Sequence, residues 1–248
     1  MRILVASGGS GGHIFPAVCV FEYLKKNKDS DILFVTTRKQ SDRKMISRAT
    51  DNIKTITIGP MPAPLEKPFL TGPASQKKGL GHIGFFVKFA LGFMQSIFIM
   101  LKFKPDVVVG FGGYVCGPII LAARFLRIPS LIHEQNVYPG RANKLVSKFA
   151  TKIALGFQET KKYFNKANVF VAGNPIRDEF ASTNRRQARE KLGIQDAEFN
   201  ILVMGGSQGS HKINMIAVEA IRKIKNKVGG ICVTHLTGKD DADVVKKA

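Results

Sequence analysis

Short apolar runs rich in β-branched residues alternate with segments whose apolar residues recur at helical spacing. The runs predict strands at residues 2–6, 31–36, 53–58, 106–109, 130–133, 152–155, 168–171, 201–204 and 230–235. The segments between them predict helices from about residue 14, from residue 41, over 83–102, 119–125, 140–149 and 213–225, and the start of a further helix after residue 235. This strand–helix–strand order predicts an α/β fold built on doubly wound parallel sheets.

Three of the strand runs end in glycine-rich turns that also carry polar side chains. The turns read GGSGGH at residues 8–13, GFGGY at 110–114 and GGSQG at 205–209, and each leads toward a predicted helix. A strand, glycine turn and helix in this order present backbone N–H groups to phosphate. One such turn is consistent with a tight connection alone. Three turns carrying Ser10, His13, Ser207 and Gln208 predict a ligand site at the carboxyl edge of a parallel sheet.

The pattern divides the chain into two predicted domains. Residues 1–172 hold most of the predicted strands, together with a loop at 59–82 that is long enough to be functional or mobile. A Gly-Asn-Pro turn and the polar segment 182–190 separate them from residues 173–248. The second part has too few strands for a self-sufficient doubly wound sheet. We therefore expect it to be the first part of a larger domain or to take strands from elsewhere.

The formal net charge of +20 and the pI of about 10.1 indicate an anionic partner: nucleic acid, anionic lipid or a phosphorylated substrate. No acidic residue lies between Glu66 and Asp106, where six lysines surround a phenylalanine-rich run. This combination predicts contact with an anionic membrane surface by the N-terminal end of the helix and the loop before it. A buried crossover helix is the alternative. Residues 85–101 are shorter than the roughly 20 needed to span a bilayer, so we expect the helix not to cross it.

The cysteine and histidine patterns indicate no metal site. Cys19, Cys116 and Cys232 are odd in number and far apart, which favours neither a disulfide framework nor zinc. The chain begins at once with a strand pattern rather than with the regions of a signal peptide. We therefore expect a protein that is not secreted and works in a reducing cytosol.

Five motifs together resemble the MurG family of peptidoglycan glycosyltransferases: GGSGGHIFPA (8–17), KPDVVVGFGGYVCGP (104–118), IHEQNVYPGRANK (132–144), GNPIR (173–177) and GGSQGS (205–210). The resemblance implies a GT-B fold, in which an N-terminal Rossmann-like domain takes the lipid-linked acceptor and a C-terminal one takes most of the UDP-sugar. It implies inverting transfer of N-acetylglucosamine from UDP-N-acetylglucosamine to undecaprenyl-pyrophosphoryl-MurNAc-pentapeptide (lipid I to lipid II), without a cofactor. It also implies a peripheral place on the cytoplasmic face of the bacterial inner membrane. The family's C-terminal domain extends well beyond the length present here.

The resemblance also implies the residues that bind the donor. By motif, the positions that match UDP-N-acetylglucosamine contacts of the family are Ser10, Gly11, Gly12, Asn136, Arg177 and Ser207, and Gln208 lies in the same turn as Ser207. Ser10 stands where threonine is more usual and Ser210 where alanine is usual. Both changes keep a small side chain, so neither much weakens the assignment.

The chemistry of the transfer requires a base for the acceptor hydroxyl and N–H dipoles or positive charge for the leaving diphosphate. His13 is the first candidate for the base or a proton relay, because a helix N-terminus disfavours the imidazolium. A binding or capping role is its alternative. Glu134 is the second candidate, as base or as the group that orients the base. We expect His133 to be a structural histidine.

Other classes of protein fit the sequence less well. A dinucleotide-dependent oxidoreductase needs a glycine where Ile14 stands and an acidic residue after the second strand, where Thr36, Thr37 and Arg38 occur. A basic adaptor for nucleic acid or membrane explains the charge but not the three turns. The chain has no RNA-binding or helix-turn-helix signature, so we expect no nucleic-acid partner. A GT-B enzyme that uses another UDP-sugar and a lipid acceptor stays an alternative.

Overall fold

The computed structural model describes residues 1–26, 30–57, 78–164, 168–194, 199–206, 209–225, 227–228 and 230–247, without the side chains of residues 78–83 and 181. The chain forms two compact units, Met1–Arg177 and Asp178–Ala248. The sequence-based boundary lay after residue 172, so the structural division falls slightly later. Each unit is described by itself.

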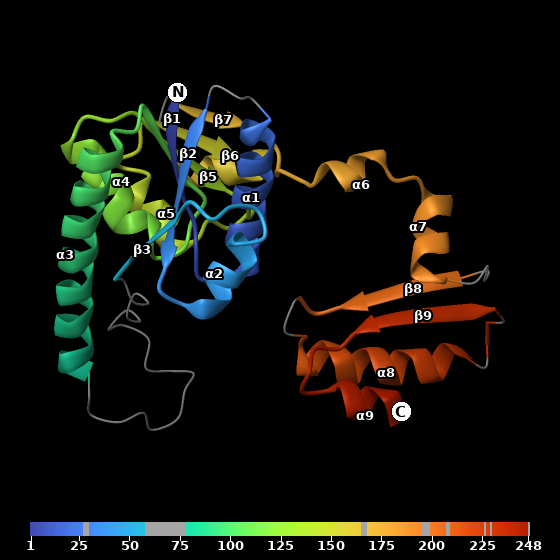
Figure 1. Ribbon diagram of the computed structural model, residues 1–248. Coiled ribbons are helices and arrows are strands. Elements are labelled where there is room, and N and C mark those ends of the chain that lie inside the picture. Colours follow the sequence, from blue (N-terminus) through green and yellow to red (C-terminus); the bar gives the residue numbers. More distant parts are fainter. Residues whose placement is uncertain are drawn as a thin grey trace. The chain divides into compact units, whose positions relative to one another are not determined.

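The first unit is a parallel sheet of seven strands with helices on both faces (Figure 1). The strands are β1 (Arg2–Ala6), β2 (Asp31–Thr37), β3 (Ile53–Ile56), β4 (Val107–Gly110), β5 (Ser130–Glu134), β6 (Lys152–Leu155) and β7 (Val169–Val171). The helices are α1 (Gly11–Lys25), α2 (Gln40–Ile46), α3 (Lys78–Phe103), α4 (Cys116–Phe125) and α5 (Arg141–Val146), followed by the 3₁₀ helix η1 (Gln158–Tyr163). The predicted α/β class is confirmed.

The strand order β3-β2-β1-β4-β5-β6-β7 reverses its direction of growth between β1 and β4. These two strands are direct neighbours, with Ile3 opposite Val107 and Ala6 opposite Gly110. Both lead into predicted glycine turns, which therefore leave the same edge of the sheet side by side. Ligands of open α/β sheets bind at this kind of switch point.

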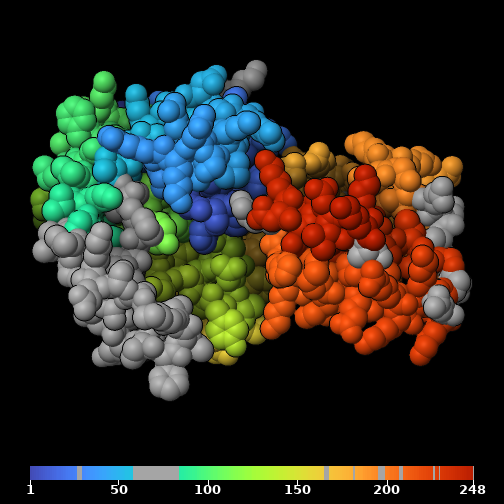
Figure 2. Space-filling view, turned by 90° about the horizontal axis from the view of Figure 1, so that it is seen from below, coloured from blue at the N-terminus to red at the C-terminus, as the bar shows by residue number. Residues whose placement is uncertain are grey.

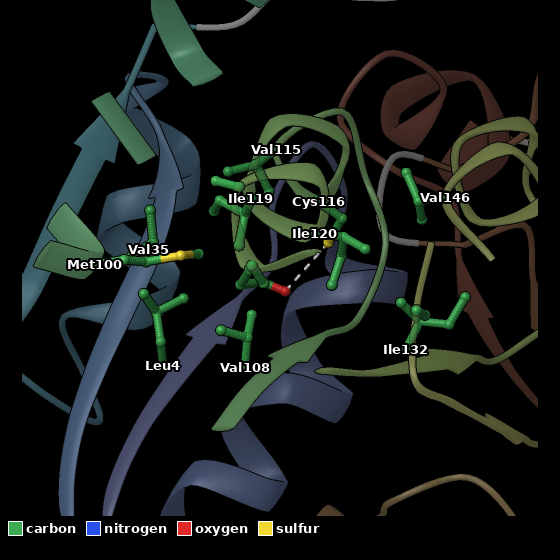
Figure 3. Close-up of a cluster of buried hydrophobic side chains, with 14 of the residues drawn as sticks. Leu4, Val35, Met100, Val108, Val115, Cys116, Ile119, Ile120, Ile132 and Val146 are labelled. Carbon is green, nitrogen blue, oxygen red and sulfur yellow. Dashed lines mark hydrogen bonds between the residues drawn. The ribbon is translucent and has the colours of Figure 1, made fainter. Parts of the chain in front are cut away.

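Alternate residues of the strands pack on opposite faces of the sheet. Ile3 and Val5 belong to a cluster with α1 and α2, whereas Leu4 and Ala6 belong to a cluster with α3 and α4. Figure 3 shows the second cluster, in which side chains from β1, β2, β4 and β5 meet those of α4 and Met100 of α3. Each fully buried aliphatic side chain contributes about 1.5–3 kcal/mol to stability. The switch point therefore lies between two packed apolar layers.

Cys116 ties the second glycine turn to this core. Its thiol lies 3.1 Å from the carbonyl oxygen of Gly112 and 3.4 Å from that of Ala6, the contact dashed in Figure 3. The sulfur also accepts the Gly112 N–H at 3.1 Å. Burial raises the pKa of the Cys116 thiol to about 12. The group is therefore a neutral structural partner and not a nucleophile at neutral pH.

Helix α3 begins at Lys78, inside the segment predicted as a loop. Gly92 lets it approach β3 closely, since a Cβ there would lie 2.8 Å from the carbonyl oxygen of Thr57. Gln95 accepts the Thr57 N–H at 2.7 Å, and Met100 is buried in the core. Within the described chain, residues 84–103 are long and apolar enough to cross a membrane, so the expectation that the stretch is too short was wrong. Its packing nevertheless commits one side of α3 to the sheet.

The second unit contains two parallel strands, β8 (Phe199–Met204) and β9 (Ile231–Leu236), in the part of it that is described. Its helices are α6 (Asp178–Ser182), α7 (Arg185–Leu192), α8 (His211–Lys225) and α9 (Ala242–Lys247). Helix α7 occupies most of the segment predicted as a polar separator. A capping box between Asn184 and Gln187 starts it, and Gly193 ends it at a φ of 62°.

Candidate functional site

A hollow of about 280 Å³ opens at the carboxyl edge of the first unit's sheet. It is lined by the two glycine turns and the start of α5, namely Gly8, Gly9, Ser10, His13, Gly113, Tyr114, Gly140, Arg141, Ala142 and Asn143. In Figure 2, blue atoms near the start of the chain lie beside green and olive atoms of segments that follow β4 and β5. The structure therefore brings His13 and the first two predicted turns into one site.

The two turns touch through their backbones. A Cβ on Gly113 would overlap the carbonyl oxygen of Gly8, and one on Gly112 would lie 2.7 Å from Nδ1 of His13. Both glycines have left-handed backbones, with φ of 79° and 102°. Glycine is therefore required at both positions, for conformation and for the close approach of the second turn to His13.

Helix α1 begins at the first turn with Ser10 as its N-cap residue, in extended conformation. The Ser10 carbonyl accepts the N–H groups of His13 and Ile14 at 3.2 and 3.1 Å. The N–H groups of Gly11 and Gly12 lie in the first turn of the helix, where no helical acceptor exists for them. They are the groups of this turn best placed to bind an anion.

Asp42 of α2 holds the first turn from behind. One of its carboxylate oxygens accepts the Gly9 N–H at 2.8 Å and the Thr37 hydroxyl at 2.6 Å. Asp42 is buried and has little access to water, so these hydrogen bonds replace those that water would make to its carboxyl group. The Gly9 N–H is thus already used, which confines the anion-binding groups to the residues after it.

Glu134 lies at the end of β5 and is completely buried. One carboxylate oxygen accepts the backbone and side-chain N–H groups of Asn136, and the other accepts the Gly140 N–H and the Asn143 amide, all at 3.0–3.1 Å. These four hydrogen bonds fix the loop between β5 and α5. Glu134 is not among the residues that line the hollow. Its catalytic role stays a prediction.

His13 is instead contacted by the next residue, Gln135. Nδ1 of His13 lies 3.0 Å from Oε1 of Gln135. Nε2 of the same amide lies 2.9 Å from the Phe111 carbonyl oxygen and 3.1 Å from Nδ1 of His133. The contact joins α1 to β5 across the switch point.

His133 is buried beneath this contact, and its Nε2 lies 2.9 Å from the carbonyl oxygen of Gly173. Burial lowers the pKa of His133 below its ordinary value of 6.5, although the Gly173 carbonyl and Glu134 oppose this shift. The neutral ring donates from Nε2 to Gly173 and accepts from Gln135 at Nδ1. The structure supports the predicted structural role.

The depressed pKa of His133 predicts a loss of stability in acid. Below about pH 6.5 the unfolded chain binds a proton at this position more readily than the folded chain. The free energy of unfolding should therefore fall as the pH is lowered, and His133→Gln should show a shallower fall. Urea unfolding at several pH values, followed by NMR signals of buried methyl groups such as that of Ile132, measures both slopes. Equal slopes would contradict the assignment.

The GNPIR segment docks on the same loop. Besides the Gly173 contact, the side-chain amide of Asn174 donates to the backbone carbonyl of Gln135 at 3.1 Å. Asn136 and Arg177 are exposed and do not line the hollow. Of the other predicted donor contacts, Ser207 and Gln208 lie outside the described residues.

A polar network of the second unit surrounds the start of α8, the helix that follows the third turn. Asn214, buried in α8, donates to the Thr237 carbonyl and to Asp241, both at 2.8 Å, and accepts from His235 at 3.0 Å. Asp241 also lies 2.8 Å from Nδ1 of His211. The pKa of Asp241 is lowered, mainly by the hydrogen bond from His211 and to a smaller extent by that from Asn214. This network fixes the start of α8.

Three residues that shape the site were not predicted from the sequence: Asp42, Gln135 and Asn143. Gln135 had a usable signal, because it directly follows β5 at the carboxyl edge of the sheet, where polar side chains of this fold meet ligands. Asn143 is buried, and its Nδ2 faces the His133 carbonyl and Glu134. Its Oδ1 has no hydrogen-bond partner among the described residues. Nothing in the spacing of Asp42 or Asn143 indicated these contacts.

Comparisons with known proteins agree with this arrangement. Residues 3–155 match the model of the glycosyltransferase family 28 N-terminal domain. Two relatives are each named UDP-N-acetylglucosamine–N-acetylmuramyl-(pentapeptide) pyrophosphoryl-undecaprenol N-acetylglucosamine transferase. The one from Caldanaerobacter subterraneus is 40% identical over 247 residues, which cover 99% of this chain and 64% of the relative. The one from Geobacter sulfurreducens is 35% identical over 255 residues, covering 100% and 64%.

Solved structures show the same fold. The crystal structure of Acinetobacter baumannii MurG matches with a TM-score of 0.70 at 24% identity, over 99% of this chain and 63% of that one. A UDP-GlcNAc 2-epimerase from Neisseria meningitidis bound to UDP-GlcNAc matches with a TM-score of 0.62 at 18% identity, over 100% and 67%. The chain thus spans a little under two thirds of the length of the relatives described above. The resemblance and GT-B-like fold inferred from the motifs are confirmed: the chain belongs to glycosyltransferase family 28.

Proposed function

We propose that this protein is the part of an inverting glycosyltransferase that holds the acceptor and the base. The complete enzyme would move N-acetylglucosamine from UDP-N-acetylglucosamine to undecaprenyl-pyrophosphoryl-MurNAc-pentapeptide in peptidoglycan synthesis. Family membership and the names of the relatives support this reaction. The observation that carries it is His13, held by Gln135 beside the first turn of α1 in an open hollow.

The geometry supports His13 as the base. A base must take the proton of the acceptor hydroxyl while the sugar is transferred. With Nδ1 engaged by Gln135, the remaining ring nitrogen, Nε2, is the one that can receive a proton. His13 is half-buried and lines the hollow, so a substrate hydroxyl can reach it.

The N–H groups of Gly11 and Gly12 and the guanidinium of Arg141 provide positive electrostatic potential for a diphosphate at the same hollow. We assign Ser10, Gly11, Gly12, Asn136, Arg177, Ser207 and Gln208 to the donor by their motif positions. In this assignment residues 1–172 take the lipid-linked acceptor, and residues 173–248 take much of the UDP-sugar.

The test is transfer of radiolabelled N-acetylglucosamine from UDP-N-acetylglucosamine to a soluble analogue of the lipid acceptor. The enzyme is this chain followed by the part of the Caldanaerobacter relative beyond their match, termed the extended enzyme. We expect label in the acceptor product, and much less from UDP-glucose or UDP-N-acetylgalactosamine. A folded extended enzyme that transfers no label, or that prefers another UDP-sugar, would overturn the proposal.

The outward face of α3 supports peripheral contact with the cytoplasmic face of the inner membrane. Its exposed apolar residues recur at helical spacing and form a stripe, the α3 stripe, made of Val87, Leu91, Met94, Phe98 and Leu101. Phe98 is 69% exposed and Met94 is 62% exposed. Lysines 88, 102 and 104 flank the stripe, and no acidic residue lies on α3. An apolar stripe with lysine neighbours suits the interface of an anionic bilayer.

The α3 stripe predicts binding to vesicles. The 248-residue chain should sediment with vesicles that contain anionic lipid more than with neutral ones, and salt should weaken this preference by screening. Replacing both Leu91 and Phe98 with Gln should weaken binding by about tenfold to a hundredfold, from the apolar area no longer buried in lipid.

The matched control is Phe180→Gln, which removes from α6 a phenylalanine that is 62% exposed. It should leave vesicle binding unchanged. Lys88→Gln combined with Lys102→Gln should remove the preference for anionic lipid. Vesicle binding that is unchanged by the α3 stripe substitutions and is equal for anionic and neutral lipid would contradict the membrane proposal.

A further inference from the structure

We propose that Gln135 is a positioning residue for His13: its side-chain oxygen holds the imidazole proton on Nδ1 and so keeps the other ring nitrogen, Nε2, unprotonated. The catalytic consequence rests on the proposed transferase function. The protonation pattern itself does not, because it follows from the hydrogen-bond partners alone.

The partners determine which way the Gln135 amide faces. One end of the amide faces two carbonyl oxygens, that of Phe111 at 2.9 Å and that of His133 at 3.1 Å, and also lies 3.1 Å from Nδ1 of His133. An amide oxygen placed there would face two carbonyl oxygens at hydrogen-bonding distance without a proton between them. This end must therefore be the NH₂ group, which has two protons to donate.

The opposite end is then the oxygen, which lies 3.0 Å from Nδ1 of His13. An amide oxygen can only accept, so Nδ1 of His13 must carry the proton. In a neutral imidazole the second nitrogen, Nε2, then has the free lone pair. The same reasoning makes His133 a donor at Nε2, to Gly173, and an acceptor at Nδ1.

The contact has a further property that suits a base. Gln135 is buried and neutral, so it orients the ring without the charge of a carboxylate, which would favour the imidazolium before substrate arrives. After proton transfer to Nε2, the Nδ1–H of the cation still donates to Gln135. The amide thus serves both protonation states of the ring in one geometry.

Gln135 also connects separate segments of the site. Its NH₂ group binds the Phe111 carbonyl of the second glycine turn, and its backbone carbonyl accepts from Asn174 of the GNPIR segment. The position of the His13 ring is therefore set by β5 and by the turn after β4 together. A side chain without both an acceptor and a donor at these points cannot reproduce this arrangement.

The direct test is NMR of the 248-residue chain labelled with ¹⁵N at histidine, at a pH where His13 is neutral. Loss of one set of ring signals in His13→Asn assigns His13. We expect a protonated Nδ1 and an unprotonated Nε2 in the unaltered chain. In Gln135→Met, which keeps similar volume but neither hydrogen-bonding group, we expect the proton to move largely to Nε2, the form that free histidine prefers.

The matched control is Gln95→Met. Gln95 also uses both ends of its amide, on Thr57, but lies on α3 away from His13. It should leave the His13 signals unchanged. An unaltered chain with its His13 proton on Nε2 overturns the proposal, even if Gln135→Met does not fold. An unchanged ring in folded Gln135→Met overturns it equally.

Kinetics separate positioning from general stability. In the extended enzyme, Gln135→Met should lower kcat about tenfold to a hundredfold, less than removal of the base, while KM for UDP-N-acetylglucosamine changes less than about threefold. Gln95→Met should change neither. The expected NMR pattern without sugar transfer would leave the protonation pattern standing and overturn the transferase proposal alone. A kcat unchanged in Gln135→Met would show that the pattern is not used in catalysis.

Discussion

Turnover of the extended enzyme is expected to fall by about two to four orders of magnitude when His13 is replaced by alanine. The ring is the group in the hollow whose second nitrogen can take the acceptor proton, and alanine leaves the acceptor hydroxyl without a base. Binding of UDP-N-acetylglucosamine should change little, because the backbone N–H groups of Gly11 and Gly12 remain. Single-turnover transfer of radiolabelled sugar and a separate titration of the donor measure the two effects.

A second variant tests the competing candidate. Glu134→Gln leaves His13 in place but disturbs a carboxylate that accepts four hydrogen bonds from its own loop. We expect it to lower thermal stability more than His13→Ala does and to reduce kcat less. Turnover of His13→Ala within threefold of the unaltered enzyme would remove His13 from catalysis. A larger loss of kcat in a stably folded Glu134→Gln would make Glu134 the base.

Gly113→Ala is expected to be severely damaging, both to stability and to turnover. The new methyl group would overlap the carbonyl oxygen of Gly8, so one of the two glycine turns must move. The left-handed backbone of residue 113 adds about 1–2 kcal/mol of strain. A displacement near 1 Å at the reacting groups lowers turnover about a hundredfold. Thermal unfolding of the 248-residue chain and kcat of the extended enzyme measure the two losses.

The control for Gly113→Ala is Gly193→Ala. Gly193 also has a left-handed backbone, with φ of 62°, but a Cβ there meets no atom within 4 Å. The Gly193→Ala variant should lose only the part of its free energy of unfolding that corresponds to backbone strain, and its turnover should be unchanged. If the two variants lose equal stability and turnover, the contact between the turns is not what requires glycine at position 113.

Much of the first unit follows from local pattern. β1, β2, β5 and β6 lie within a residue of their predicted bounds, because their apolar runs are short and interrupted by polar or glycine-rich segments. The parallel order follows from the helices between them. The start of α3 was missed because Pro and Gly residues before residue 83 resemble a loop. Helix α7 was not predicted because its residues are mostly polar. The Asn184–Gln187 capping box that starts it was a signal that can be read from the sequence.

The glycine turns of the site could be predicted from the sequence, but the residues that hold these turns and His13 in place could not. His13 and the glycines stand out because their types and positions are unusual for a plain connection. Gln135 lies 122 residues from His13 in the sequence, and Asp42 lies 33 residues from Gly9. Neither contact can therefore be recognised from the residues next to it in the sequence. Only the register of the sheet brings these pairs together. Charge was equally ambiguous until the structure showed which side of α3 is exposed.

The anchoring of Gly173 and Asn174 determines where the chain is able to bend. The Gly173 carbonyl accepts from His133 and the Asn174 side-chain amide donates to the Gln135 carbonyl, so both residues are held at the end of β5. The following Pro175 has a fixed φ. Any hinge between the two units must therefore lie after Asn174. A change of backbone torsion after Asn174 would therefore leave the contacts of His133 and Gln135, and with them the His13 ring, in place.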